Sequence, residues 1–245
     1  THFDNLDFGT VKGFSFGYDL RRTNNVSLTA NYTLQFADGT GSTATSASSI
    51  IETQPNLRTT LPLDFDQRHN ITANIDYRYS YGMNYNGPIL FGKKILQGFG
   101  ANFMLSAGSG TPYSRQTNVD EAGSFDSPAT PQLDGTLNGS RKPWTFRADL
   151  RLNKDFRFKV SDTRDIKMNV YMMVENLLDA DNIVSVYQYT GNADDDGWLT
   201  HPDGIQSTEQ AVVPASYYDL YNLKVNNPNN YIRPRLIKLG MQLNF

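Results

Sequence analysis

The sequence predicts an all-β protein whose fold class is a transmembrane antiparallel β-barrel. Three observations predict it: apolar and polar residues alternate strictly, the alternating segments are long, and the connections between them are alternately short and long. Alternation indicates strands because successive side chains of a strand point to opposite faces of the sheet. The predicted sheet therefore has one apolar face and one polar face.

Seven segments carry this alternation. In the clearest, Val26 to Phe36, every second residue is apolar and every residue between is polar, without exception. The other segments lie at residues 13–20, 70–81, 98–108, 146–153, 166–175 and 237–245. With their flanking residues most should form strands of roughly 11 to 16 residues, longer than the roughly 5–6 of globular strands and closer to the roughly 9–11 of membrane strands.

The connections favour a barrel wall over a soluble sandwich. Short or intermediate connections are expected at residues 22–24, 82–97 and 160–165, and long loops at about 38–65, 110–143 and 178–230. Outer-membrane barrels have short periplasmic turns and long extracellular loops, so these three loops are predicted to be extracellular. Residues 183–189, at the start of the third loop, could extend a strand. Tyr77, Tyr79 and Tyr81 lie beside a short-side connection, where an interfacial aromatic girdle is expected.

Composition excludes several other classes. The 245 residues carry a formal net charge of -3, which gives no basic surface for nucleic acid. There is no cysteine, and therefore no disulfide, thiolate metal site or cysteine nucleophile in this sequence. No apolar run approaches the roughly 18–20 residues of a membrane helix. Alternating barrel strands remain compatible with this composition because they score as polar on average.

Seven strands cannot close a barrel alone. Bacterial single-chain barrels have an even number of strands, and an open edge would leave unpaired amides facing hydrocarbon. Residues 1–245 are therefore interpreted as the C-terminal part of a larger barrel, with the missing strands supplied by sequence before Thr1.

Several short motifs fall at the ends of the predicted strands. They are PLDFDQRH at residues 62–69, SGTPY at 109–113, ENLLD at 175–179, and YIRPR at 231–235 running into LGMQLNF at 239–245. In this order and placement the chain resembles the C-terminal barrel region of TonB-dependent outer-membrane receptors, especially their Oar-like and SusC-like branch. The resemblance covers essentially the whole chain.

The resemblance implies a function and partners. It implies energised uptake of a substrate across the bacterial outer membrane through a barrel of 22 strands, of which these would be about the last seven. The plug domain and the segment that contacts the TonB complex would lie in the missing N-terminal region. Outer-membrane lipid is an expected partner and a surface lipoprotein is a candidate partner. Phe245 resembles the terminal aromatic signal read by the barrel-assembly machinery. The alternative is a structural barrel subunit of an envelope or secretion complex.

Candidate ligand-binding residues are the aromatic side chains in or beside the long loops. We select Tyr113, Trp144, Tyr187, Tyr189 and Trp198, because exposed rings can stack on a sugar or hold a peptide. The alternative is that they pack the loops against one another.

Candidate cofactors reduce to calcium. Asp194, Asp195 and Asp196 precede a glycine and could supply carboxylate oxygens, although the spacing is not that of an EF-hand; a solvated acidic turn is the alternative.

No enzyme is predicted. Residues 13–17 match G-x-S-x-G but lie within an alternating strand, without the sharp turn that a nucleophile elbow needs. Residues 87–94 approach a phosphate-binding loop but end in Lys94 in place of Ser or Thr, and no helix pattern follows. A short-side hairpin is expected there.

Overall fold

The computed structural model describes residues 8–43, 59–119, 132–161 and 164–244, and it confirms the all-β prediction. The main sheet has eight strands. Its long strands are β1 (Gly9–Thr23), β2 (Val26–Gly39), β4 (His69–Arg78), β5 (Phe99–Gly108), β8 (Thr145–Ser161), β9 (Arg164–Glu175) and β10 (Leu236–Asn244). Short β3 (Leu61–Pro62) pairs with the end of β2, and β6 (Pro112–Tyr113) pairs with β7 (Ser140–Arg141) in a separate ribbon.

The seven long strands form a meander in which each pairs antiparallel with the next along the chain. They correspond one to one with the seven alternating segments of the sequence. The bounds differ in both directions: β1 and β8 extend beyond the segments at 13–20 and 146–153, whereas the segment expected at 70–81 leaves the strand at Arg78. Tyr79 keeps a backbone bond of 2.9 Å to the Phe99 carbonyl, and the chain then turns away from the sheet through the 3-10 helix η1 (Gly82–Asn84).

The strand register places apolar side chains opposite one another from strand to strand. One row crosses all seven long strands, through Leu20, Leu28, Ile75, Phe103, Leu150, Val174 and Ile237. On the other face a polar row runs through Asn31, Thr72, Ser106 and Arg147. Because the side-chain period of a strand is two, a slip of one residue would exchange these faces, so the pattern fixes the register.

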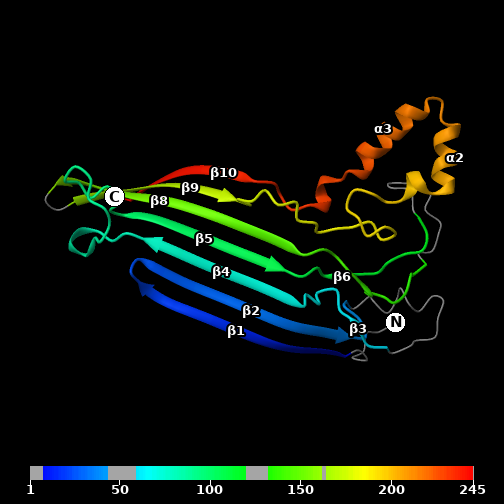
Figure 1. The fold of residues 1–245 in the computed structure, drawn as a ribbon, viewed down its shortest axis with the longest axis horizontal. Coiled ribbons are helices and arrows are strands. Elements are labelled where there is room, and N and C mark those ends of the chain that lie inside the picture. The colour runs from blue at the N-terminus through cyan, green and yellow to red at the C-terminus, as the bar shows by residue number, and fades with distance from the viewer. Residues whose placement is uncertain (1–7, 44–58, 120–131, 162–163, 245) are drawn as a thin grey trace.

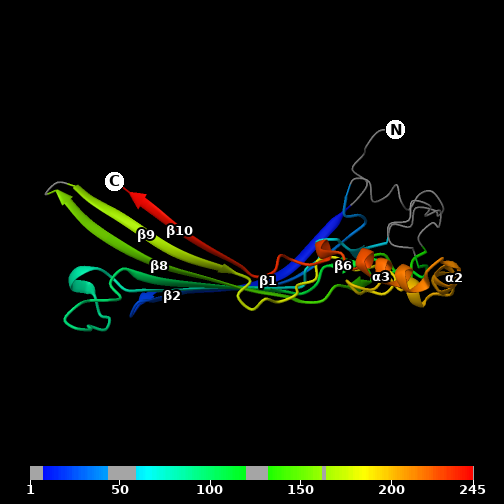
Figure 2. The ribbon, with the colours of Figure 1, turned by 90° about the horizontal axis from the view of Figure 1, so that it is seen from above.

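The sheet is a single layer in the described part of the chain. It is twisted and curved, and the two α-helices lie beyond one end of it (Figures 1 and 2). The long strands contact chiefly their sheet neighbours, whereas the helices pack on each other. Large apolar side chains consequently remain exposed on the sheet, Leu239 by 80% and Phe14 by 61%. The buried residues lie mostly at the loop end, where the connections pack together.

The third long connection contains helices that the sequence analysis did not predict. They are η2 (Trp198–Thr200), α2 (Pro202–Gln210), α3 (Pro214–Val225) and η3 (Pro228–Asn230). The expectation that residues 183–189 extend a strand is wrong; Ile183 makes only an isolated bridge to Tyr231. Proline opens both α-helices, where its fixed backbone angle suits the first turn.

Candidate functional site

The motif at residues 62–69 forms the most buried polar junction of the loop end. The Asp66 side chain is 1% exposed and accepts a hydrogen bond of 2.8 Å from the Ala37 backbone N–H. Its other oxygen pairs with the Arg141 guanidinium, which also donates at 2.6 Å to the Asp66 carbonyl. Arg68 Nε lies 3.7 Å from the same carboxylate. Asp66 therefore joins the end of β2 to β7, which belongs to a different long connection.

Asn138 makes a second link between these two connections. Its side-chain amide donates to the Pro62 carbonyl at 2.9 Å and to Asp64 Oδ1 at 2.7 Å. Nearby, Gln67 Nε2 donates to the Ser109 carbonyl at 3.0 Å, and Ser109 Oγ accepts from the His69 N–H at 2.9 Å. The motifs at 62–69 and 109–113, separate in sequence, thus meet in space and fix the base of the first two long connections.

The motifs at 175–179 and 231–235 form a comparable clasp. Asn176, which is buried, donates from its side-chain amide to the Arg233 carbonyl at 3.3 Å. Its backbone N–H donates to Asp149 Oδ1 at 2.8 Å. Arg235 pairs with Asp179 at 3.0 Å and also donates its backbone N–H to that carboxylate. The clasp closes the base of the third connection beside the start of β10.

The three consecutive aspartates of the acidic turn have different partners. Asp194 accepts from the Tyr231 hydroxyl. Asp195 Oδ1 accepts from the Gly197 N–H at 2.8 Å. Asp196, which is buried, accepts from the Trp198 N–H at 3.0 Å and from the Tyr221 hydroxyl at 2.5 Å.

The carboxylates of the acidic turn are used in hydrogen bonds within the chain. Each carboxylate is hydrogen-bonded to a separate group, and two of them tie the turn to α3 and to Tyr231. Among the residues that the structure describes, no group of three or more His, Cys, Asp or Glu side chains is placed to hold a metal ion. The geometry therefore offers no support for calcium at Asp194, Asp195 and Asp196, although these carboxylates were the candidate ligands.

Two tyrosines in this region have phenol pKa values raised above the usual value. The hydrogen bond to Asp194 is the main reason that the pKa of Tyr231 rises to about 12, because an anionic phenolate would lose that bond and face the carboxylate. Burial is the main reason that the pKa of Tyr187 is raised, and the Asp196 charge acts in the same direction. Both phenols therefore stay neutral donors across the physiological range.

Two of the five candidate aromatic residues line one cavity. Tyr187 and Tyr189 border a space of about 230 Å³ together with Gln116, Asn118, Val186, Gln188 and Asp196. The cavity lies between the second and third long connections, which are joined there by a 3.1 Å bond from the Gln116 N–H to the Gln188 carbonyl. Tyr113 lies close by, with its hydroxyl against Gly191, where a Cβ would come within 2.5 Å of it.

The two candidate tryptophans lie apart from that cavity and pack against other side chains. Trp144 stacks on His69 with ring centroids 5.5 Å apart, and His69 Nδ1 is 3.0 Å from the Tyr32 hydroxyl. Trp198 donates from its indole N–H to the Tyr217 hydroxyl at 3.1 Å and stacks on His201. These contacts favour the packing alternative for both tryptophans.

The polar face of the sheet forms a larger hollow, of about 510 Å³. Its lining is entirely polar and comes from five strands: Asp76, Arg78, Asn102, Arg151, Asn153, Asp155, Asn169, Gln242 and Asn244. Arg151 also lies over the Tyr171 ring, 4.7 Å from its centroid. Acidic, basic and amide groups are interspersed, so the hollow suits a hydrated or polar occupant better than an apolar one.

Sequence reasoning missed Asp66, Arg141 and Asn138 as organising residues. Asp66 lies within the motif at residues 62–69, whereas Arg141 and Asn138 lie in none of the motifs described above. The available signal was the concentration of Asp, Asn and Arg at strand ends, which does not identify partners. Phe245, the candidate assembly signal, lies outside the described residues.

None of the helices in the described segments is long and apolar enough to cross a membrane. No protein-family model, curated protein or solved structure matches this chain.

Proposed function

We propose that this chain forms part of the wall of an outer-membrane β-barrel that takes up a substrate with energy relayed by TonB. One observation carries the proposal: a single-layer sheet has an apolar face across seven strands and a polar, hollowed face behind it. A barrel wall in a membrane needs this distribution, with lipid on one side and water or a polar domain on the other.

The exposed apolar side chains argue against a sheet whose apolar face contacts water. Phe14, Phe16, Leu239 and Met241 are each more than half exposed, and they lie on the face that the apolar rows define. Monomeric soluble proteins rarely expose contiguous apolar patches larger than a few hundred Å². In a bilayer the same side chains would contact acyl chains at no cost.

The open edges of the sheet support the larger barrel. β1 and β10 are the terminal strands of the meander, and each pairs with only one neighbour among the described strands. As first and seventh members of an antiparallel series they run in the same direction. An odd number of additional strands would therefore close the barrel with antiparallel pairs throughout, and the fifteen that a 22-stranded barrel requires meet this condition.

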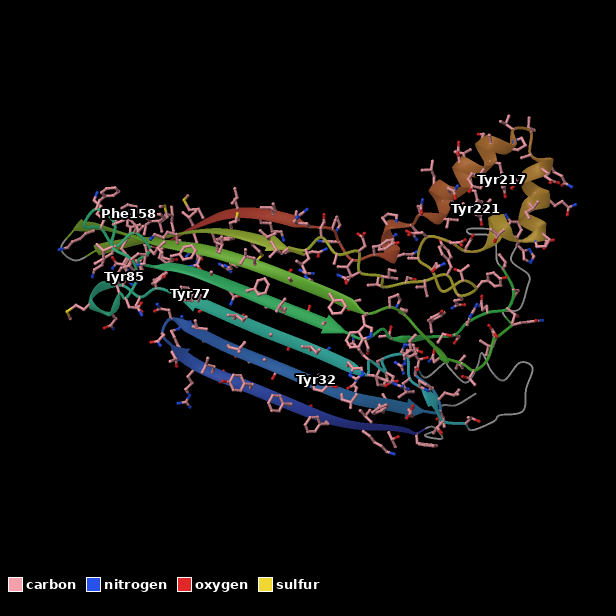
Figure 3. The ribbon with its side chains drawn as sticks, in the orientation of Figure 1. Tyr32, Tyr77, Tyr85, Phe158, Tyr217 and Tyr221 are labelled. Atoms are coloured by element: carbon pink, nitrogen blue, oxygen red, sulfur yellow. The ribbon has the colours of Figure 1, made fainter. Side chains whose placement is uncertain are left out.

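Aromatic groups near both ends of the sheet support its placement in a bilayer. At the turn end, Tyr77 contacts Tyr79 at 5.1 Å between ring centroids, and Tyr79 contacts Tyr85 at 5.8 Å. Figure 3 shows Tyr77, Tyr85 and Phe158 at this end and Tyr32 nearer the other. Tyr32 there forms a stack with His69 and Trp144. Such girdles occupy the two membrane–water interfaces.

In this proposal the loops and the polar face have separate roles. The cavity beside Tyr187 and Tyr189 would be a first contact site for substrate, since phenol rings and amides converge there. The 510 Å³ hollow would border the route through the barrel. No covalent chemistry is assigned to either region.

Cysteine labelling of intact cells tests the topology. Val212, which is fully exposed, lies between α2 and α3, and Asn24 is exposed in the turn between β1 and β2 at the opposite end of the sheet. In cells that produce the full-length protein, we expect Val212→Cys to react with a membrane-impermeant maleimide and Asn24→Cys to react only after lysis. Equal labelling of both before lysis would contradict the proposed orientation.

Nutrient-dependent growth tests energised transport against the scaffold alternative. A strain lacking this gene and a strain lacking TonB should lose growth on the same single nutrient in a defined panel. A general loss of envelope integrity, without a nutrient-specific defect shared with the TonB mutant, would favour a structural barrel subunit instead.

A further inference from the structure

The connection between β4 and β5 is both apolar and basic. Residues 79–98 contain Lys93 and Lys94 and no acidic residue. Paired backbone bonds between Leu90 and Lys93, at 2.9 and 3.0 Å, close a tight turn at its tip. Phe91 and Gly92 occupy this turn with positive φ angles of 50° and 72°, so the tip has a defined shape.

The tip presents large hydrophobic side chains to the outside. Phe91 is 93% exposed and Met83 is fully exposed. The other exposed apolar side chains of the connection are Ile89, Leu90 and Ile95. Packing within the protein does not explain a phenylalanine at the end of a two-residue turn, because nothing in the described chain covers it.

Two contacts anchor the connection to the apolar face of the sheet. Lys154 shares that face with Leu152, and its ammonium donates to the carbonyls of Ile95 and Gln97, each at 2.7 Å. Tyr77, also on that face, donates its hydroxyl to the Tyr79 hydroxyl at 3.0 Å. The exposed tip therefore continues the apolar face of the strands beyond the end of the sheet.

The charge at this end of the sheet is positive, although the chain as a whole carries -3. Three stretches of sequence at this end each comprise a connection, in two cases with the strand residues beside it: residues 21–25, 79–98 and 157–167. They contain eight basic residues, Arg21, Arg22, Lys93, Lys94, Arg157, Lys159, Arg164 and Lys167, against two acidic ones, Asp162 and Asp165. The complementary surface is anionic.

We propose that residues 79–98 form an interfacial anchor that binds the anionic phospholipid leaflet at the turn end of the barrel. The proposal rests on the membrane placement argued above. Ile89, Leu90 and Phe91 enter the boundary between headgroups and acyl chains, and Lys93 and Lys94 contact lipid phosphates. Exposed apolar groups beside lysines are the pattern by which peripheral segments bind anionic membrane surfaces.

Site-directed fluorescence in vesicles tests this anchor. The chain has no native cysteine, so single cysteines can be labelled with an environment-sensitive dye. The full-length protein is reconstituted in phosphatidylcholine, with or without phosphatidylglycerol, and quenching by brominated acyl chains is measured. Phe91→Cys reports on the tip, Ile71→Cys on the apolar face, and Val212→Cys is the exposed control at the opposite end.

We expect quenching at positions 71 and 91 and none at position 212, with stronger quenching at 91 when phosphatidylglycerol is present. Lys93→Gln combined with Lys94→Gln should reduce the ratio of inserted to solvent-exposed tip by roughly five-fold per lysine. The matched charge control, Lys142→Gln in the second long connection, should leave this ratio unchanged.

Three results would overturn the inference, and they separate it from the proposed function. Quenching at 71 without quenching at 91 leaves the barrel in place and removes the anchor. Equal quenching at 91 in both lipids, unaffected by the lysine substitutions, removes the anionic headgroup as the ligand. Absence of quenching at both 71 and 91 removes the membrane wall and the anchor with it.

Discussion

Replacing Asp66 with asparagine should loosen the junction between the first two long connections. Asp66 is almost fully buried and faces the guanidinium of Arg141, with Arg68 at 3.7 Å. An asparagine side chain would keep the shape and could still accept the bond from the Ala37 N–H, but the two arginines would lose their shared counter-charge. The substitution therefore isolates the electrostatic part of the junction.

The expected magnitude follows from burial. Removing one partner of a fully buried ion pair costs about 3–5 kcal/mol, because the remaining charge stays desolvated. The Arg141 side chain is 25% exposed, so water relieves part of that penalty. We therefore expect a loss of roughly 2–3 kcal/mol in the free energy of local opening, which corresponds to about 30- to 150-fold faster exchange of backbone amides.

Hydrogen exchange measured by mass spectrometry reads this opening directly. Peptides that cover residues 61–69 and 138–144 should exchange faster in Asp66→Asn, while peptides from β5 should not change. Arg115→Gln is the matched control, because its 3.4 Å pair with Asp134 is about half exposed on both sides. Such an exposed pair contributes no more than about 1 kcal/mol.

A double-mutant cycle decides whether the pair itself is responsible. Arg141→Gln in the Asp66→Asn background should add less than it does alone, with a coupling of about 1–3 kcal/mol. Two results would refute a stabilising role for the Asp66–Arg141 pair: exchange rates in Asp66→Asn that match those of the Arg115→Gln control, or strictly additive effects of the two substitutions.

Three other changes have definite expected outcomes. The hydrogen bond from Tyr231 to Asp194 raises the pKa of the phenol to about 12, so its contribution should be complete below pH 10 and lost as pH rises through about 12. Ultraviolet titration should show one fewer high-pKa tyrosine in Asp194→Asn; an unchanged titration would contradict the bond. Added terbium should give no saturable luminescence sensitised by Trp198, because the carboxylates of Asp194, Asp195 and Asp196 are hydrogen-bonded to separate groups. Saturable emission would show that the acidic turn rearranges around an ion. Lys154→Met should release the β4–β5 connection, because its ammonium bonds to two carbonyls there, and should increase the mobility of a spin label at the tip of the connection. Lys12→Met, at the far end of the apolar face, should leave that mobility unchanged. Equal mobility in both variants would show that Lys154 does not hold the connection.

The strands could be predicted because their signal is local. In β2 each residue between Val26 and Phe36 indicates its face by its own polarity, and the register then follows from keeping the apolar residues on one side. The sequence predicts that β4 extends to residue 81, beyond its observed end at Arg78, because Tyr79 and Tyr81 continue the alternation. Their side chains instead pack in the connection, where Tyr81 bonds to the Asp155 carbonyl.

The helices and the loop junctions could not be predicted in the same way. α2 contains Gly204, Ser207 and Thr208, which are weak helix formers, so its sequence gives little helical signal. In α3 the buried residues Tyr221 and Val225 are one turn apart, and no other buried residue extends this pattern along the helix. Likewise, nothing in the sequence near Asp66 indicates that its partner is an arginine 75 residues later.

The clasp described above bears on which part of the chain can be replaced. It joins Asn176 and Asp179 to Arg233 and Arg235. β9 and β10 are adjacent in the sheet, and the clasp brings the chain back to its starting point before β10 begins. Whatever length of chain lies beyond it is an appendage whose closure costs little more as it grows. Residues 184–230 can therefore be exchanged for another fold, by evolution or by an engineer, without disturbing the strands that carry them.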